Sequence, residues 1–169
     1  MSEIVNRVAQ SGLITIDLEE MFPEGERVYF DISTLLVEGL LLREKDFREF
    51  ISRHDWTQYR DKHVALYCST EAIVPRWAWM LLTVSLSPVV ATLVFGNAEA
   101  LETELFRRRL EKINPEDYRD QRVVIKGCSS KPVPVQAYVA LSLLLQPVVK
   151  SILYGEPCST VPVYRKARG

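Results

Sequence analysis

Tyr59-Arg60-Asp61 recurs as Tyr118-Arg119-Asp120, and Pro88-Val89-Val90 recurs as Pro147-Val148-Val149, both at an offset of 59 residues. Over the segment from residue 59 to residue 96, this offset gives 13 identities in 38 aligned pairs. Chance, at roughly one identity in sixteen positions, would give about two or three. An internal repeat therefore organises the chain, and the fold is interpreted from it.

Each repeat has the pattern of a helix, a strand, a second helix and a second strand. Apolar residues at helical spacing alternate with continuous apolar runs that are typical of buried strands. Proline at the first turn marks the start of the second helix in each unit, and Pro88 marks where that helix has ended in the first. In the first unit, the predicted elements are a helix at 41–53, a strand at 63–67, a helix that starts at Pro75 and ends before Pro88, and a strand at 89–95. In the second unit, the helices are 101–112 and 134–145, and the strands are 122–126 and 148–154.

Strands that alternate with helices predict an α/β fold around a mostly parallel sheet, with right-handed crossovers. We expect one compact domain with repeat units at 39–97 and 98–156, and a C-terminal tail at 157–169. Residues 1–38 form an N-terminal extension packed on the core. Its alternating segments 13–18 and 27–32 flank a turn and predict a β-hairpin.

The composition excludes several classes of protein. The chain has 169 residues, 47% of them hydrophobic and 25% charged, and its formal net charge is -1. This balance gives no field that would attract nucleic acid or an anionic membrane. The first residues lack a secretion signal and the apolar run 79–86 is too short to span a bilayer, so we expect a cytoplasmic protein that binds neither nucleic acid nor membranes.

The three cysteines occur in one local sequence, Cys-Ser followed by Ser or Thr, each just after a predicted strand. If those strands are parallel neighbours, Cys68, Cys128 and Cys158 share the carboxyl edge of one sheet, where open α/β folds place ligands. Thiolates are soft ligands that suit zinc or an iron–sulfur cluster, which makes a metal site the leading interpretation. The spacing matches no standard finger or ferredoxin pattern, so inert structural cysteines are the alternative.

A cysteine nucleophile lacks a base, because the only histidines are His54 and His63. His63 opens the strand that Cys68 follows, about 16 Å away along a strand that rises roughly 3.3 Å per residue. We therefore expect no Cys-His dyad within one unit, and a non-catalytic protein is favoured.

Hydroxyl and backbone N–H groups next to the cysteines could bind an anion at the same sheet edge. The candidate ligand-binding residues are Ser69, Thr70, Ser129, Ser130 and Lys131. No glycine-rich phosphate motif accompanies them, so helix capping is the default interpretation.

Over nearly its full length, the chain resembles an uncharacterised bacterial family catalogued only as a domain of unknown function. The segments that carry the resemblance are residues 4–8, 11–18, 44–48, 73–75, 123–129 and 154–162. The resemblance brings no activity or catalytic residue. It implies a gene context near iron–sulfur cluster assembly, and hence iron–sulfur assembly proteins as partners.

Three functional hypotheses follow. The first is an accessory protein that binds a metal ion or iron–sulfur species through the three cysteines. The second is a structural or interaction module with inert cysteines, and the third is a small-molecule enzyme with an anion site at the sheet edge. An apolar edge strand could also pair across the axis of a homodimer.

Overall fold

The structure is a computed structural model that describes residues 5–8, 12–127 and 130–169. The chain forms two compact units. Unit 1 combines Met1–Pro23 with Leu105–Gly169, and unit 2 is Glu24–Glu104. Unit 2 is thus inserted in the sequence of unit 1. The prediction was a single domain with boundaries after residues 38, 97 and 156. The division differs because the two strands of each repeat share a sheet with a strand from the N-terminal segment.

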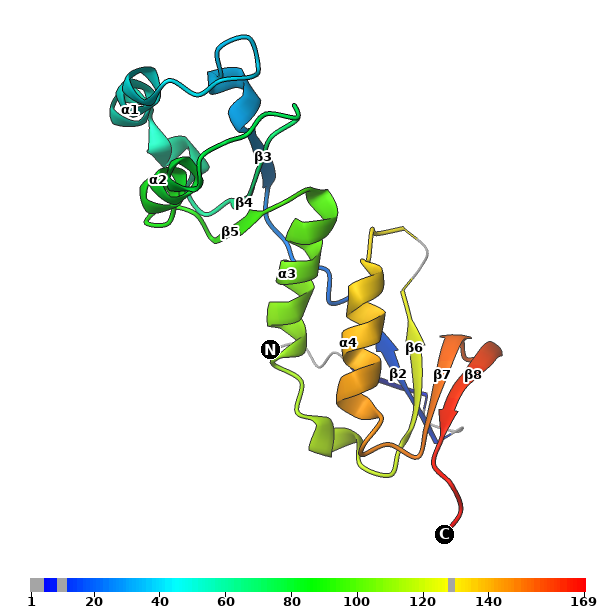
Figure 1. Cartoon of the computed structure of the whole chain (residues 1–169). Helices are drawn as coiled ribbons and strands as arrows, with labels where there is room; N and C mark the ends of the chain where they lie inside the picture. Colours follow the sequence, from blue (N-terminus) through cyan, green and yellow to red (C-terminus); the bar gives the residue numbers. More distant parts are fainter. Residues whose placement is uncertain (1–4, 9–11, 128–129) are drawn as a thin grey trace. The chain divides into compact units, whose positions relative to one another are not determined.

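Unit 2 contains a fully parallel three-stranded sheet in the order β3-β4-β5 (Figure 1). Its elements are β3 (Arg27–Asp31), η1 (Ile32–Leu35), α1 (Glu44–Arg53), η2 (Trp56–Tyr59), β4 (His63–Tyr67), α2 (Arg76–Leu86), β5 (Thr92–Phe95) and the start of α3 (Ala98–Leu110). Phe30, Val64 and Leu66 on one face of this sheet share a core with Phe47 of α1 and Leu82 of α2.

Unit 1 contains a five-stranded sheet in the order β1-β2-β6-β7-β8. Its elements are β1 (Val5–Val8), β2 (Leu13–Asp17), the end of α3, η3 (Pro115–Tyr118), β6 (Arg122–Lys126), α4 (Val135–Leu145), β7 (Ser151–Glu156) and β8 (Ser159–Arg165). The inner strands β2, β6 and β7 are parallel, and the outer strands β1 and β8 pair with them antiparallel. The predicted α/β class with mostly parallel strands is confirmed.

The repeated Tyr-Arg-Asp sequence forms the turn before β4 and β6. Tyr59 and Tyr118 are buried, and Asp61 and Asp120 adopt left-handed backbone with φ of 59° and 56°. The Asp61 N–H donates to the Val89 carbonyl at 2.9 Å, and the Asp120 N–H donates to the carbonyl at the matching position, Val148, at 2.8 Å. Aspartate tolerates this conformation better than most residues, which gives the motif a structural reason.

The predicted hairpin between segments 13–18 and 27–32 is wrong in its pairing. β2 pairs with β6 in one sheet and β3 pairs with β4 in the other, both in parallel. The two strands end alike, since Asp17 accepts the N–H of Glu19 at 2.9 Å and Asp31 accepts the N–H of Ser33 at 3.0 Å. The first strand of each unit therefore comes from the segment that the repeat analysis set apart as an extension.

The predicted tail also contains a regular element, because β8 closes the edge of the five-stranded sheet. Within the described ranges, no helix has both the length and the apolar composition that crossing a membrane requires.

Candidate binding groove

The two described cysteines belong to different units of the chain. Cys68 follows β4 in unit 2 and is half-buried, with its Sγ 3.4 Å from the Thr70 Oγ1. Cys158 is exposed in the turn between β7 and β8 of unit 1. The premise that the strands before the cysteines are neighbours in one sheet is wrong, since β4 lies in a different sheet from β6 and β7.

Cys128 lies outside the described residues, and the metal assignment to the three cysteines stays a prediction. Among residues 5–8, 12–127 and 130–169, no group of three His, Cys, Asp or Glu side chains has a geometry that could hold a metal ion. The histidines make local contacts: His54 Nε2 lies 3.0 Å from the Tyr59 hydroxyl, and His63 Nδ1 lies 3.1 Å from the Thr92 hydroxyl.

In unit 2, the residues predicted to bind an anion surround a carboxylate of the chain itself. The Ser69 N–H donates to Asp31 Oδ1 at 3.0 Å, and the hydroxyls of Ser69 and Ser33 are 2.9 Å apart. Burial acts to raise the pKa of Asp31, but the hydrogen bonds from Ser69 and Ser33 outweigh it and lower that pKa. The Thr70 hydroxyl donates to the Gly39 carbonyl at 2.7 Å.

In unit 1, Glu19 is the carboxylate that accepts hydrogen bonds from the predicted anion-binding residues. The Glu19 carboxylate accepts the N–H of Ser130 at 2.8 Å and its hydroxyl at 3.0 Å. Lys131 Nζ is 3.4 Å from the Glu19 carbonyl oxygen and 5.6 Å from the centre of the Phe22 ring. Ser129 lies outside the described residues. In both units, carboxylates of the chain thus occupy N–H groups that an external anion would need.

A different site is built on α4, a helix of mostly apolar residues that carries no charge. It begins after Pro134, whose ring suits a helix start. Ala137, Leu141 and Leu145 recur every four residues and are buried against the sheet. A surface helix normally turns a polar face to solvent. The opposite face of α4 instead carries Val135, Val139 and Leu143, which are 70%, 46% and 67% exposed.

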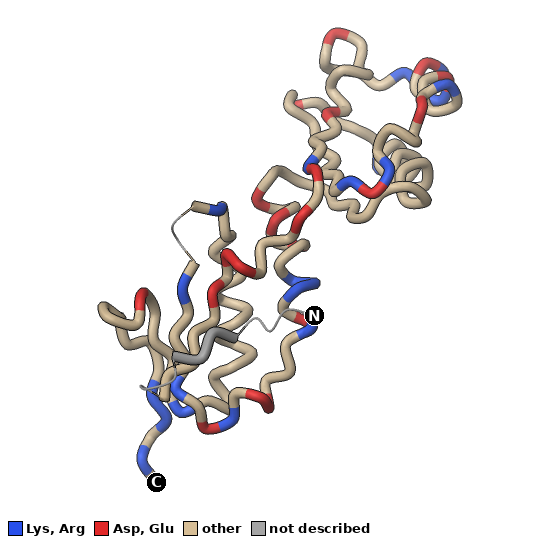
Figure 2. Tube along the Cα trace, turned by 180° about the vertical axis from the view of Figure 1, so that it is seen from behind, with Lys and Arg blue, Asp and Glu red and all other residues tan. Residues whose placement is uncertain are grey.

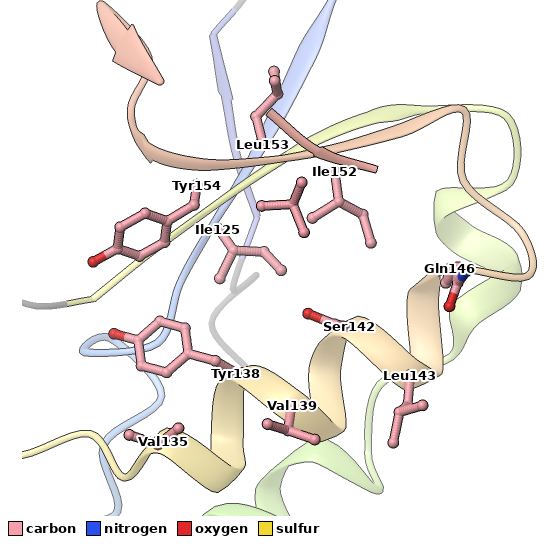
Figure 3. Close-up of a pocket in the computed structure, with 11 residues that line it drawn as sticks. Ile125, Val135, Tyr138, Val139, Ser142, Leu143, Gln146, Ile152, Leu153 and Tyr154 are labelled. Carbon is pink, nitrogen blue, oxygen red and sulfur yellow. The ribbon is translucent and has the colours of Figure 1, made fainter. Parts of the chain in front are cut away.

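A groove of about 610 Å³ runs between this face of α4 and the strands β7 and β8 (Figure 3). Tyr138 and Tyr154 lie at one end of it and Gln146 at the other. The two tyrosine rings meet edge to face with centres 5.9 Å apart, and the Tyr138 hydroxyl donates to the Gly127 carbonyl at 2.7 Å. The lining residues are Ile125, Val135, Tyr138, Val139, Ser142, Leu143, Gln146, Ile152, Leu153, Tyr154 and Val163.

None of these lining residues is charged. At the carboxyl end of the sheet, Lys126 is paired with two carboxylates, since its Nζ lies 3.5 Å from both Asp17 Oδ2 and Glu156 Oε2. Burial acts to lower the pKa of Lys126, but the two carboxylates outweigh it and raise that pKa. Basic residues gather instead in the C-terminal segment, at Arg165, Lys166 and Arg168 (Figure 2). The groove is therefore suited to an uncharged, apolar surface.

The helix α4 lies where the sequence predicts it, but the sequence does not mark it as a site. The available signal was the absence of any charged residue from Pro132 to Val149. Such a run fits a fully buried helix equally well, and only the exposure of Val135, Val139 and Leu143 in the structure shows that one face of α4 is open.

The fold and the groove define an α/β protein with two similar units, one of which carries an apolar groove. The chain belongs to the family described as a protein of unknown function (DUF2480), whose model matches residues 2–166. No curated protein and no solved structure matches the chain significantly.

Proposed function

We propose that this protein is an interaction module whose groove on α4 binds an apolar-faced helix of a partner protein. The observation that carries the proposal is the row of Val135, Val139 and Leu143 on the outer face of α4, beside a wall formed by β7 and β8. Contiguous exposed apolar residues on a soluble domain mark binding surfaces, and a grooved surface suits the apolar stripe of an amphipathic helix.

The openness of the groove favours a helix over a small molecule. Ligand pockets usually bury most of the surface of a small ligand. The rim residues Val135 and Leu143 remain about two-thirds exposed, so a small molecule in the groove would keep one side in water. A helix supplies its own outer face and needs only one side to be covered. The uncharged lining requires a partner stripe that is itself uncharged.

The energy available is adequate for a specific but reversible contact. Covering the exposed parts of Val135, Val139 and Leu143 gains about 1–2 kcal/mol for each side chain. The apolar residues that the partner brings add to this gain, and the cost of association subtracts from it. We expect a transient complex instead of an obligate one.

The test is a titration of the full chain with a synthetic helical peptide that has leucine at positions i, i+3, i+4 and i+7, followed by methyl NMR. We expect shifts of the Val135, Val139, Leu143 and Val163 methyl groups, and loss of binding in Val139→Asp. Met80→Asp is the matched control, because Met80 is the exposed residue of α2 at the position that corresponds to Val139.

Two results would contradict the proposal. One is the absence of groove shifts with the leucine peptide, or equal shifts with a peptide whose leucines are replaced by asparagine. The other is saturation of the groove by decanol in a titration in which the peptide does not bind, which would indicate a small apolar ligand.

A further inference from the structure

The two units treat the edges of their sheets differently. In unit 1, β1 and β8 lie on either side of the parallel strands β2, β6 and β7. In unit 2, the residues that the structure describes form a sheet of three parallel strands, β3, β4 and β5, and β3 and β5 are its edges. β5 corresponds to β7 at the offset of 59 residues, and β7 is the strand that β8 covers. Unit 2 thus exposes the strand edge that unit 1 closes.

β5 lacks the features that protect sheet edges from pairing. Natural edges are usually blocked by charged residues, proline or a bulge. Two other edge strands carry such features: Arg27 and Asp31 in β3, and Pro162 and Arg165 in β8. β8 also shifts register opposite Ile152 and Leu153. β5 reads Thr-Leu-Val-Phe and has none of them.

The backbone of β5 is oriented for pairing. The Gly96 N–H donates to the Leu66 carbonyl of β4 at 2.9 Å. Because alternate residues of a strand direct their N–H and C=O groups to opposite sides, Leu93 and Phe95 direct theirs away from β4. These are the groups that a further strand would bond.

Apolar side chains flank this edge. Phe95 is 68% exposed, and its ring meets Trp79 of α2 edge to face with centres 5.0 Å apart. Met80 and Val84 are exposed on the same helix. In unit 1, Tyr138 and Tyr154 occupy the positions of this aromatic pair, and there β8 continues the sheet beyond β7.

We propose that β5 pairs antiparallel with β5 of a second copy of this chain about a twofold axis at Phe95, so that the two Phe95 residues face each other and the two three-stranded sheets join into one. A twofold contact sets each surface against itself, so like charges on it would repel. The chain carries no charged residue from Trp77 to Ala98, which covers most of α2 and all of β5. This charge-free surface fits a second copy, and the contact is independent of the groove on α4.

Sedimentation velocity of the full chain, up to about 1 mM, tests the proposal. We expect the wild type to form a dimer and Phe95→Glu to weaken the association at least tenfold, because two carboxylates would meet across the axis. The matched control is Tyr29→Glu on the other edge of the same sheet, where Tyr29 is 44% exposed, and it should leave the association unchanged. Val84→Glu on α2 is a second interface variant, should Phe95→Glu fold poorly.

Mixing Phe95→Glu with Phe95→Lys should restore the dimer, because opposite charges then meet across the axis. A wild type that is monomeric at every concentration would overturn the proposal, as would a mixture that fails to associate. Weakening by Tyr29→Glu but not by Phe95→Glu would place the contact at β3 instead. Binding of a peptide with the sequence of residues 159–165 to a monomeric wild type would show that a foreign strand, and not a second copy, occupies β5.

Discussion

Removing the Glu102 carboxylate should destabilise unit 2 far more than removing an exposed carboxylate. Glu102 on α3 holds Arg27 of β3 through two bonds, Nε to Oε1 at 2.8 Å and Nη2 to Oε2 at 3.1 Å. The two side chains are only 14% and 10% exposed. Alanine has the best helix propensity, so Glu102→Ala tests the contact and not the helix.

The magnitude follows from the charge that the substitution leaves behind. Breaking a buried ion pair by removing one partner costs about 3–5 kcal/mol, because the remaining charge is poorly solvated. Arg27 keeps a 2.7 Å hydrogen bond to the Gly25 carbonyl, so we expect the lower end, about 3 kcal/mol. Replacing both partners, in Arg27→Met with Glu102→Leu, should recover most of the loss.

Urea unfolding followed by tryptophan fluorescence measures this change, because Trp56, Trp77 and Trp79 all lie in unit 2. The matched control is Glu44→Ala, which removes an exposed partner of Arg48 with side chains 62% and 57% exposed. It should cost about 0.5 kcal/mol or less. A loss for Glu102→Ala no larger than that of Glu44→Ala would refute the reasoning.

Three further predictions concern the turn, the sheet edge and the cysteines. Asp120→Val should lower stability by about 1–2 kcal/mol in thermal unfolding, because a β-branched residue is poorly tolerated at a φ of 56°; an unchanged melting temperature would contradict this. The folded-state pKa of Asp31 is lowered, so its stabilising contribution is full above the unfolded value of about 3.8 and is lost as pH falls through the folded value. The stability difference between wild type and Asp31→Asn should therefore shrink below that pH, and a constant difference in acid titrations would argue against the hydrogen bonds. The metal hypothesis predicts near-stoichiometric zinc or iron in protein purified without oxygen, lost when Cys68, Cys128 and Cys158 are all replaced by serine; protein that stays metal-free after reconstitution would leave the thiols as packing residues.

Local patterns were sufficient for the elements of the repeat. The continuous apolar runs at His63–Tyr67 and Arg122–Lys126 are strands with the predicted bounds. The helices α2 and α4 begin directly after Pro75 and Pro134, one residue later than predicted. These features depend on residues close in sequence, whose periodicity and backbone preferences act before any distant contact forms.

The candidate site needed information that local patterns do not contain. The Cys-Ser sequences do recur after strands. The cysteines were expected to meet at one sheet edge, however, and this required β4 to share a sheet with β6 and β7. Ser69 and Ser130 lie at the expected sheet edges, yet Asp31 and Glu19 reach their backbone N–H groups from distant segments. No property of the sequence near either serine indicates which carboxylate it meets.

By itself, the sequence determined that this is an α/β protein with a repeated unit, helices at α2 and α4 and a turn at each Tyr-Arg-Asp, because these follow from short-range periodicity and sterics. Only the tertiary structure decided that β2 and β3 belong to separate sheets, that the cysteines divide between two units, and that one face of α4 stays open beside β8. Strand pairing joins segments far apart in the chain, and its energy depends on which apolar faces can be buried together.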